Sequence, residues 1–145
     1  MNFRYPTHPT FHQPAMNTPQ FTTVDYPESD GRPMGETDEH RDVMFRNIEL
    51  LKTHYEGQQV YVTGDLLLYY QQGDPKKFVV PDAFIVKRKP QVQKHTYKLW
   101  VERIVPQLVI ETTSKKTKKK DLHVKPAIYA QIGVHEYFLF DPTCD

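Results

Sequence analysis

Two carboxylates within otherwise apolar segments are the residues whose type and spacing point most directly to chemistry. Asp82 lies in the middle of the apolar run 77–86, and Glu111 ends the short apolar run 107–111. A carboxylate buried without a partner destabilises the fold strongly, or its pKa rises until it takes up a proton. Both charges therefore need a partner, and the identity of that partner decides what the site does.

A divalent cation is one partner that suits both carboxylates. If the two segments form neighbouring strands in register, Asp82 and Glu111 converge at one edge of a sheet, where two anions repel unless a cation separates them. Ligands that offer only oxygen favour Mg²⁺ (or Mn²⁺), which keeps several waters and binds phosphate oxygens. Such an ion would activate a water for attack on a phosphodiester. The alternative is a pair of strand-end carboxylates, each capped by a backbone N–H or solvated.

A basic run follows the second carboxylate. Residues 115–120 contain five lysines. They are Lys115, Lys116, Lys118, Lys119 and Lys120. Such a cluster is suited to hold a nucleic-acid backbone near the metal, with salt-dependent affinity. The alternative is an ordinary solvated basic loop.

The elements that must position these residues are strands and helices of a single mixed sheet. Residues 77–86 predict one buried strand, because apolar, aromatic and β-branched types dominate. Residues 59–70 predict a second strand, in which Gly64 marks a bulge or sharp bend. The turn 71–75 predicts that this strand forms a hairpin with the Asp82 strand.

The second half of the chain predicts a strand–helix–strand unit. Residues 87–102 read as a polar loop, 107–111 as a strand and 112–120 as a basic loop. A helix is expected from Asp121 to Ile132, ended by Gly133, before a last strand at 136–140. This unit predicts a right-handed parallel crossover. The fold class is therefore α/β in composition, an α+β mixed sheet flanked by helices.

An amphipathic helix is predicted before the first strand, capped by Thr37 or Asp38 and ended by Gly57. Its apolar stripe consists of His40, Met44, Ile48, Leu51 and Tyr55. His40 falls at the N-terminal end of this stripe, where core gives way to rim. It is either a core-edge histidine bonded to backbone or a group that reaches into a site.

Composition limits the class of protein. The 145 residues have a mean hydropathy of −0.68 and a net charge of +1. This net charge is too small to indicate a nucleic-acid partner by itself. The single cysteine, Cys144, excludes a disulfide framework and a Cys/His zinc pattern. No apolar run approaches the roughly 20 residues of a membrane span, and no signal core is present. We expect a soluble, cytoplasmic protein without a membrane partner.

Two regions are expected. Residues 1–34 are rich in Pro, Thr, His and Gln without periodicity, so we predict an irregular, partly disordered arm that ends in the turn 29–33. Phe11, Phe21 and Tyr26 are candidates to attach this arm to the body. Residues 35–145 would form one domain.

Several blocks together resemble a known family. Segments 80–86 and 105–117, then Asp121 with Lys125 and Tyr129, then segment 133–142, are similar to the Uma-type ("Uma two") restriction endonuclease family. This family belongs to the PD-(D/E)XK nuclease superfamily. The resemblance covers about residues 25–142, and the predicted first helix with His40 fits the family's opening helix, where such a histidine recurs.

The resemblance implies a restriction-endonuclease-like core and a nuclease that hydrolyses phosphodiester bonds of DNA, with RNA as the alternative substrate. It implies that Asp82 and Glu111 are Mg²⁺ ligands. Thr113 occupies the position of the superfamily's usual lysine, so Lys125, from the following helix, is expected to supply that cation; Thr113 and His40 would form the rim. The alternative function is a catalytically inactive nucleic-acid- or partner-binding module that retains the nuclease fold.

Two departures from the family pattern carry expectations of their own. Pro126 follows Lys125 and predicts that the helix begins there or is kinked, with Lys115 and Lys120 as fallback cations. The sequence stops three residues after Pro142, whereas family members continue with further strands. The strand 136–140 is therefore expected to keep an open apolar edge, prone to aggregation or suited to a homodimer contact.

Overall fold

The computed structural model describes residues 23–32 and 37–143. The elements in chain order are α1 (Asp38–His54), β1 (Val60–Thr63), β2 (Leu68–Tyr69), β3 (Phe78–Val79), β4 (Ala83–Lys87), β5 (Tyr97–Lys98), α2 (Leu99–Glu102), β6 (Leu108–Thr112), α3 (Lys118–His123), α4 (Lys125–Ile132) and β7 (Glu136–Phe140). Among these described residues, no helix is long and apolar enough to cross a membrane.

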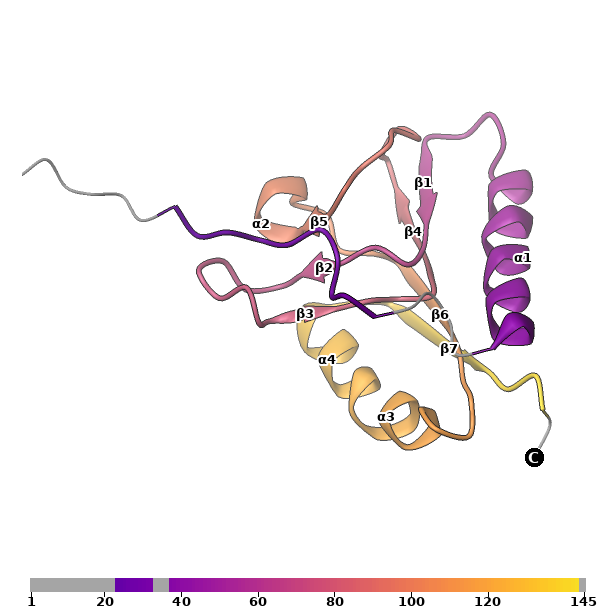
Figure 1. The fold of residues 1–145 in the computed structure, drawn as a ribbon. Helices are drawn as coiled ribbons and strands as arrows, with labels where there is room; N and C mark the ends of the chain where they lie inside the picture. Colours follow the sequence, from indigo (N-terminus) through magenta and orange to yellow (C-terminus); the bar gives the residue numbers. More distant parts are fainter. Residues whose placement is uncertain (1–22, 33–36, 144–145) are drawn as a thin grey trace, which may run out of the picture.

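The main sheet has the strand order β1-β4-β6-β7. β4 pairs antiparallel with β1 and with β6, whereas β6 and β7 run parallel. In Figure 1, α1 stands beside β1 and β4, whereas α3 and α4 lie away from it, near β3 and β7. The predicted mixed sheet flanked by helices is confirmed, and β6, α3, α4 and β7 form the predicted parallel crossover connection.

Helix α1 forms over most of the predicted stripe, but it ends at His54, with Tyr55 as its C-cap, rather than at Gly57. The Thr37 side chain accepts a hydrogen bond from the backbone N–H of His40 at 3.1 Å, which caps the helix. Met44 and Ile48 are buried and pack with Val60, Val62, Ala83 and Ile85 of the main sheet. The stripe therefore attaches α1 to one face of the sheet and carries His40 to the end of that contact.

The predicted strand 59–70 is wrong as a single element. It divides into β1 and β2, which belong to different sheets, because the chain turns at Gly64. A Cβ placed on Gly64 would lie 1.9 Å from the backbone oxygen of Asp82. Only glycine permits this approach, so the predicted bend is correct and the continuous pairing is not.

The predicted strand 77–86 is also divided. Residues Phe78–Val79 form β3, Ala83–Lys87 form β4, and Asp82 lies in the bend between them rather than inside a strand. Pro81 lacks an N–H for a strand ladder, which favours the interruption. The predicted hairpin is confirmed, since β2 pairs antiparallel with β3.

The segment 87–102 is not a plain loop, as the sequence suggested. It contains β5, which runs parallel to β2, and the short helix α2. Tyr97 of β5 is fully buried, with its ring 5.5 Å from that of Phe84 and 6.2 Å from that of Tyr61. A two-residue strand has no periodicity to detect, so only this tertiary packing reveals it.

The predicted helix 121–132 begins earlier and is interrupted. Lys118–His123 form α3, so three of the lysines assigned to a basic loop are helical, and Val124 separates α3 from α4. Pro126 lies in the first turn of α4, where its missing N–H is tolerated, as expected for a helix that begins beside it. Gly133 ends α4 with φ 93°, as predicted.

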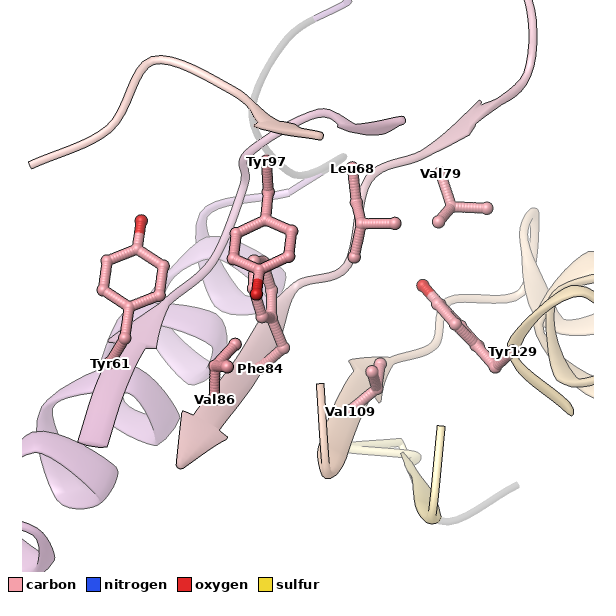
Figure 2. Packing of buried hydrophobic residues seen from close by; sticks show 8 residues of the cluster. All are labelled: Tyr61, Leu68, Val79, Phe84, Val86, Tyr97, Val109 and Tyr129. Carbon is pink, nitrogen blue, oxygen red and sulfur yellow. The ribbon is translucent and has the colours of Figure 1, made fainter. Parts of the chain in front are cut away.

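The core lies between the two sheets and α4. Figure 2 shows eight buried residues of this cluster: Tyr61, Leu68, Val79, Phe84, Val86, Tyr97, Val109 and Tyr129. Tyr129 extends from its helix toward the strands, with its hydroxyl pointing away from α4. These residues therefore form a closely packed apolar layer on which neighbouring polar side chains can be positioned.

The arm attaches to the body through Tyr26. Its ring lies 5.1 Å from the rings of Tyr69 and Trp100, and its hydroxyl accepts a hydrogen bond from the backbone N–H of Gly73 at 2.6 Å. The expected contact of Tyr26 is thus confirmed. Phe11 and Phe21 lie outside the described residues.

Candidate functional site

The register between β4 and β6 brings the two carboxylates of the sequence hypothesis together. Ala83 pairs with Ile110 and Phe84 with Val109, so the same antiparallel register sets Asp82 opposite Glu111. In addition, the backbone N–H of Thr112, the residue after Glu111, donates to Asp82 Oδ2 at 2.7 Å. The two acids therefore converge at one end of the β4–β6 pair.

Asp82 is held from two sides and remains partly open. Besides the Thr112 N–H, its Oδ2 lies 3.4 Å from Nε2 of His40 on α1. Its side chain is 17% exposed. The backbone contact matches the capped-carboxylate alternative, and the histidine contact adds a second element to the site.

Glu111 is completely buried, with 0% of its side chain exposed. Its Oε2 lies 2.9 Å from Nζ of Lys125, and its Oε1 accepts a hydrogen bond from the Tyr129 hydroxyl at 2.6 Å. Both partners come from α4, which packs against β6 across the apolar core. Neither carboxylate oxygen is therefore left without a donor.

Lys125 is the lysine that reaches the carboxylates. Its Nζ also lies 3.1 Å from Oδ1 of Asp121, and its side chain is only 16% exposed. Lys115 and Lys120, the fallback cations, are both exposed. The interruption at Val124 places Lys125 as the first residue of α4, so Pro126 does not prevent the contact.

His40 lies at the rim of this group, as one of its two interpretations predicted. Its ring contacts the Asp82 carboxylate rather than serving only the core of α1. Thr113 is buried on the same face of the chain as Glu111, with its N–H donating to the carbonyl of Phe140 at 2.8 Å. Thr113 supplies no cation, and the ammonium comes from α4 instead.

The electrostatics of the buried group follow from burial and close charges. Burial raises the pKa of Glu111 to about 8, with Asp82 adding to the rise and Lys125 opposing it. For Lys125, burial lowers the pKa, but Glu111 and Asp121 outweigh it and raise the pKa above its usual value. Burial and the nearby Glu111 raise the pKa of Tyr129, which keeps its proton as a hydrogen-bond donor.

Asp82 and Glu111 offer the oxygen atoms that a hard divalent cation prefers as ligands. Asp82, Glu111 and Asp121 bring three carboxyl groups close to the Lys125 ammonium, and like charges at this distance repel unless a proton or a cation neutralises them. Within the described ranges, no group of three or more His, Cys, Asp or Glu side chains is arranged to hold a metal. An ion here would take two carboxylates and complete its shell with water, as Mg²⁺ commonly does.

The basic run 115–120 includes the residues just before α3 and the first turn of that helix. Lys115, Lys116, Lys119 and Lys120 are exposed, whereas Lys118 lies 3.1 Å from Asp141 after β7. The run begins four residues after Glu111 in the chain. Its exposure satisfies the first requirement for contact with a phosphate backbone.

Asp121 and Tyr129 were grouped with Lys125 in one block of the family resemblance, but neither was assigned a role in the site. Asp121, Lys125 and Tyr129 recur at intervals of four residues, which places them on one face of a helical segment. That spacing was the available signal. The partner of the face, the buried end of β6, was not visible from the sequence.

Two comparisons with known proteins bear on this geometry. The Uma2 family model, described as "Putative restriction endonuclease", matches residues 15–144, nearly the whole chain. No curated protein matches the chain.

Proposed function

Because the chain belongs to the Uma2 family, we propose that it is a divalent-metal-dependent nuclease that hydrolyses phosphodiester bonds of DNA. The observation that carries the proposal is the meeting of Asp82 and Glu111 across β4 and β6, with the Lys125 ammonium 2.9 Å from Glu111. The description of the family as a "Putative restriction endonuclease" supports a nucleic-acid substrate.

Each side chain has a distinct role in this proposal. Asp82 and Glu111 would hold Mg²⁺ or Mn²⁺, which supplies an activated water and neutralises charge on the phosphate. Lys125 places a fixed positive charge beside Glu111, where it can orient a water or stabilise charge that develops on the phosphorus oxygens. His40 and the Thr112 N–H hold Asp82 in position.

The exposed lysines would bind the phosphate backbone. Each phosphate neutralised releases counterions, so affinity should fall steeply as salt concentration rises. Four exposed lysines, Lys115, Lys116, Lys119 and Lys120, are the candidates for these contacts. They set orientation and affinity rather than sequence preference.

Nicking of supercoiled plasmid with Mg²⁺ or Mn²⁺ tests the proposal. We expect cleavage by the wild type and a loss of roughly 100-fold or more in Asp82→Asn, Glu111→Gln and Lys125→Met, the size found when one transition-state donor is removed. Lys76→Met, a change at an exposed lysine on the β2–β3 turn, is the matched control and should cut normally. Equal nicking by wild type and Asp82→Asn, or none across metals and pH values, contradicts the proposal. A parallel RNA substrate decides between the two nucleic acids.

A second candidate function is a binding module without catalysis. It is favoured by Glu111, because both of its oxygens already have partners in Lys125 and Tyr129. This function predicts salt-sensitive retention of DNA that needs no metal and survives Asp82→Asn. Calorimetric titration with Mn²⁺ separates the two: binding that requires both Asp82 and Glu111 supports the nuclease, and its absence supports the module.

A further inference from the structure

A continuous series of buried contacts runs through the site: Asp121 to Lys125, Lys125 to Glu111, and Glu111 to Tyr129. The three contacts measure 3.1, 2.9 and 2.6 Å. They join β6 to both helices of the crossover. Asp121 and Tyr129 are the outer members, and the proposed chemistry does not yet use either of them.

Asp121 is buried without an obvious structural purpose. Its side chain is 2% exposed, and its Oδ1 faces the Lys125 ammonium as an ion pair without forming a regular hydrogen bond within the described residues. Replacing a buried ion pair by apolar groups of similar shape is often neutral or stabilising. Stability alone therefore does not explain a carboxylate at this position.

The location of Asp121 matters because α3 and α4 are separated at Val124. Asp121 belongs to α3 and Lys125 is the first residue of α4, so their ion pair spans the interruption. A long lysine side chain at the start of a helix has many rotamers, and fixing it is costly in entropy. A second anion that contacts the ammonium besides Glu111 would restrict the choice among these rotamers.

Tyr129 restrains the other end of the series. Its side chain belongs to the apolar core, 1% exposed, with its ring 5.4 Å from that of Tyr137. Figure 2 shows the Tyr129 side chain extending from its helix toward the strands, with the hydroxyl at its far end. Glu111 is thereby held at Oε1 by a rigid phenol and at Oε2 by the ammonium, so its carboxylate plane is fixed.

We propose that Asp121 and Tyr129 are positioning residues of the site: Asp121 fixes the ammonium of Lys125, and Tyr129 fixes the carboxylate of Glu111. This inference rests on the proposed nuclease function and names how the reactive groups of that site are held. Misplacement of a reacting group by about 1 Å can lower a rate by roughly 100-fold. Loss of either restraint should therefore reduce turnover more than substrate binding.

The Asp121 test combines kinetics with a metal-free measurement. Asp121→Asn should lower kcat for plasmid nicking about tenfold to a hundredfold, leave KM within about twofold, and have no further effect in a Lys125→Met background under single-turnover conditions. Without metal, the ¹⁵Nζ signal of Lys125, assigned by its loss in Lys125→Met, should shift or broaden in Asp121→Asn. Asp141→Asn, which alters the ion pair between Lys118 of α3 and the residue after β7, should leave this signal unchanged.

The Tyr129 test follows the same design. Tyr129→Phe removes only the hydroxyl, so it should lower kcat with KM unchanged and should have no further effect in a Glu111→Gln background. The ¹³C signal of the Glu111 carboxyl group, measured without metal, should move in Tyr129→Phe. Thermal unfolding of both variants is measured first, and Asp121→Ser replaces Asp121→Asn if the latter does not fold.

The outcomes separate this inference from the proposed function. If the wild type cuts no plasmid, the nuclease proposal fails, while the two metal-free signals still decide whether Asp121 and Tyr129 hold their partners. Unchanged signals overturn the inference whatever the nicking result. It is likewise overturned if Asp121→Asn slows nicking by the same factor with and without Lys125.

Discussion

At the scale of single residues, the candidate site depends on a few contacts that each join two elements. Asp82 lies in the bend before β4, yet its Oδ2 contacts His40 from α1 and the Thr112 N–H from β6. Glu111 is joined in the same way to α4. The position of the Asp82 backbone therefore controls how these elements meet, and the absence of a side chain at Gly64 leaves room for that backbone.

Gly64→Ala should destabilise the protein by about 3 kcal/mol, because the added methyl group cannot be accommodated by a side-chain rotation. It would lie 1.9 Å from the carbonyl oxygen of Asp82 and 2.7 Å from Cδ1 of Ile48. Urea unfolding measures the change. Gly57→Asn is the control, since nothing lies within 4 Å of a Cβ there and Asn tolerates its positive φ. Equal midpoints for wild type and Gly64→Ala would show that this contact is not close.

At the scale of elements, the two outer strands of the main sheet, β1 and β7, differ in how their outer edges are covered. β1 is closed by a side chain: the Val62 N–H donates to Oε1 of Gln91 at 2.8 Å, and Nε2 of Gln91 donates to the Val62 carbonyl at 3.0 Å. One amide thus replaces a neighbouring strand at this point.

The segment after β4 is fixed further by Glu102 of α2, which contacts both Lys89 and Lys94 at 3.1 Å.

Gln91→Ala should expose the β1 edge and lower the free energy of unfolding by about 1–2 kcal/mol, as two partly buried backbone groups lose their partner. The sharper measurement is amide hydrogen exchange at Val62, which should accelerate by roughly tenfold or more for a loss of this size. Gln72→Ala, at an exposed turn position, should change neither quantity. Unaltered exchange at Val62 in Gln91→Ala would mean that the edge is protected by something else.

The ion pairs of Glu102 should make stability depend on pH. Burial alone would raise the pKa of Glu102, but hydrogen bonds from Lys94 and Lys89 outweigh it and lower the pKa below its usual value. Because the pKa is lowered in the folded state, the Glu102 carboxylate stabilises the protein at pH values above its ordinary pKa of 4.5. This stabilisation is lost as the pH falls through the lowered pKa of the folded state. Wild type should therefore exceed Glu102→Gln in stability by about 1 kcal/mol near pH 7. That difference should shrink toward pH 3 in thermal unfolding; a difference that grows in acid contradicts the assignment.

At the scale of the whole molecule, β7 is an outer strand of the main sheet in the part of the chain that the structure describes. Glu136 donates its N–H to Gln107, and the carbonyl of Phe140 accepts from Thr113. By strand alternation, the backbone groups of Tyr137 and Leu139 point away from β6. Phe138 and Phe140 are 56% and 48% exposed on the face that α1 covers over the other three strands. The open apolar edge expected from the sequence is thus confirmed among the described residues, while the homodimer stays a prediction.

We expect a second copy of the chain to pair along this edge. An antiparallel β7–β7 contact centred on Phe138 would place the aromatic rings of both copies side by side and would satisfy the free backbone groups symmetrically. Phe138→Lys should abolish concentration-dependent association in sedimentation experiments, since two lysines would face each other across the axis. Leu50→Lys, a change at an exposed position of α1, is the control. A wild type that is monomeric at every concentration, or a Phe138→Lys variant that still associates, contradicts this arrangement.

The sequence by itself determined the elements whose signals are local. The stripe of α1, its Thr37 cap, the Gly133 stop and the apolar runs around Asp82 and Glu111 all follow from neighbours within a few residues. The same runs were enough to identify the two carboxylates and, with the family resemblance, Lys125. Local periodicity cannot state which strand a segment joins, so 59–70 and 77–86 each looked like one strand.

Only the tertiary structure decided how these pieces meet. Each of these two runs is interrupted where Gly64 approaches Asp82. The interruption is needed because the first run contributes to two different sheets, as does the second, so the chain must change direction between them. The tertiary structure also set Asp121 and Tyr129 around Lys125 and Glu111, through the packing of the crossover helices on β6. These contacts link residues distant in the chain, and their energies come from burial and charge pairing that no local pattern encodes.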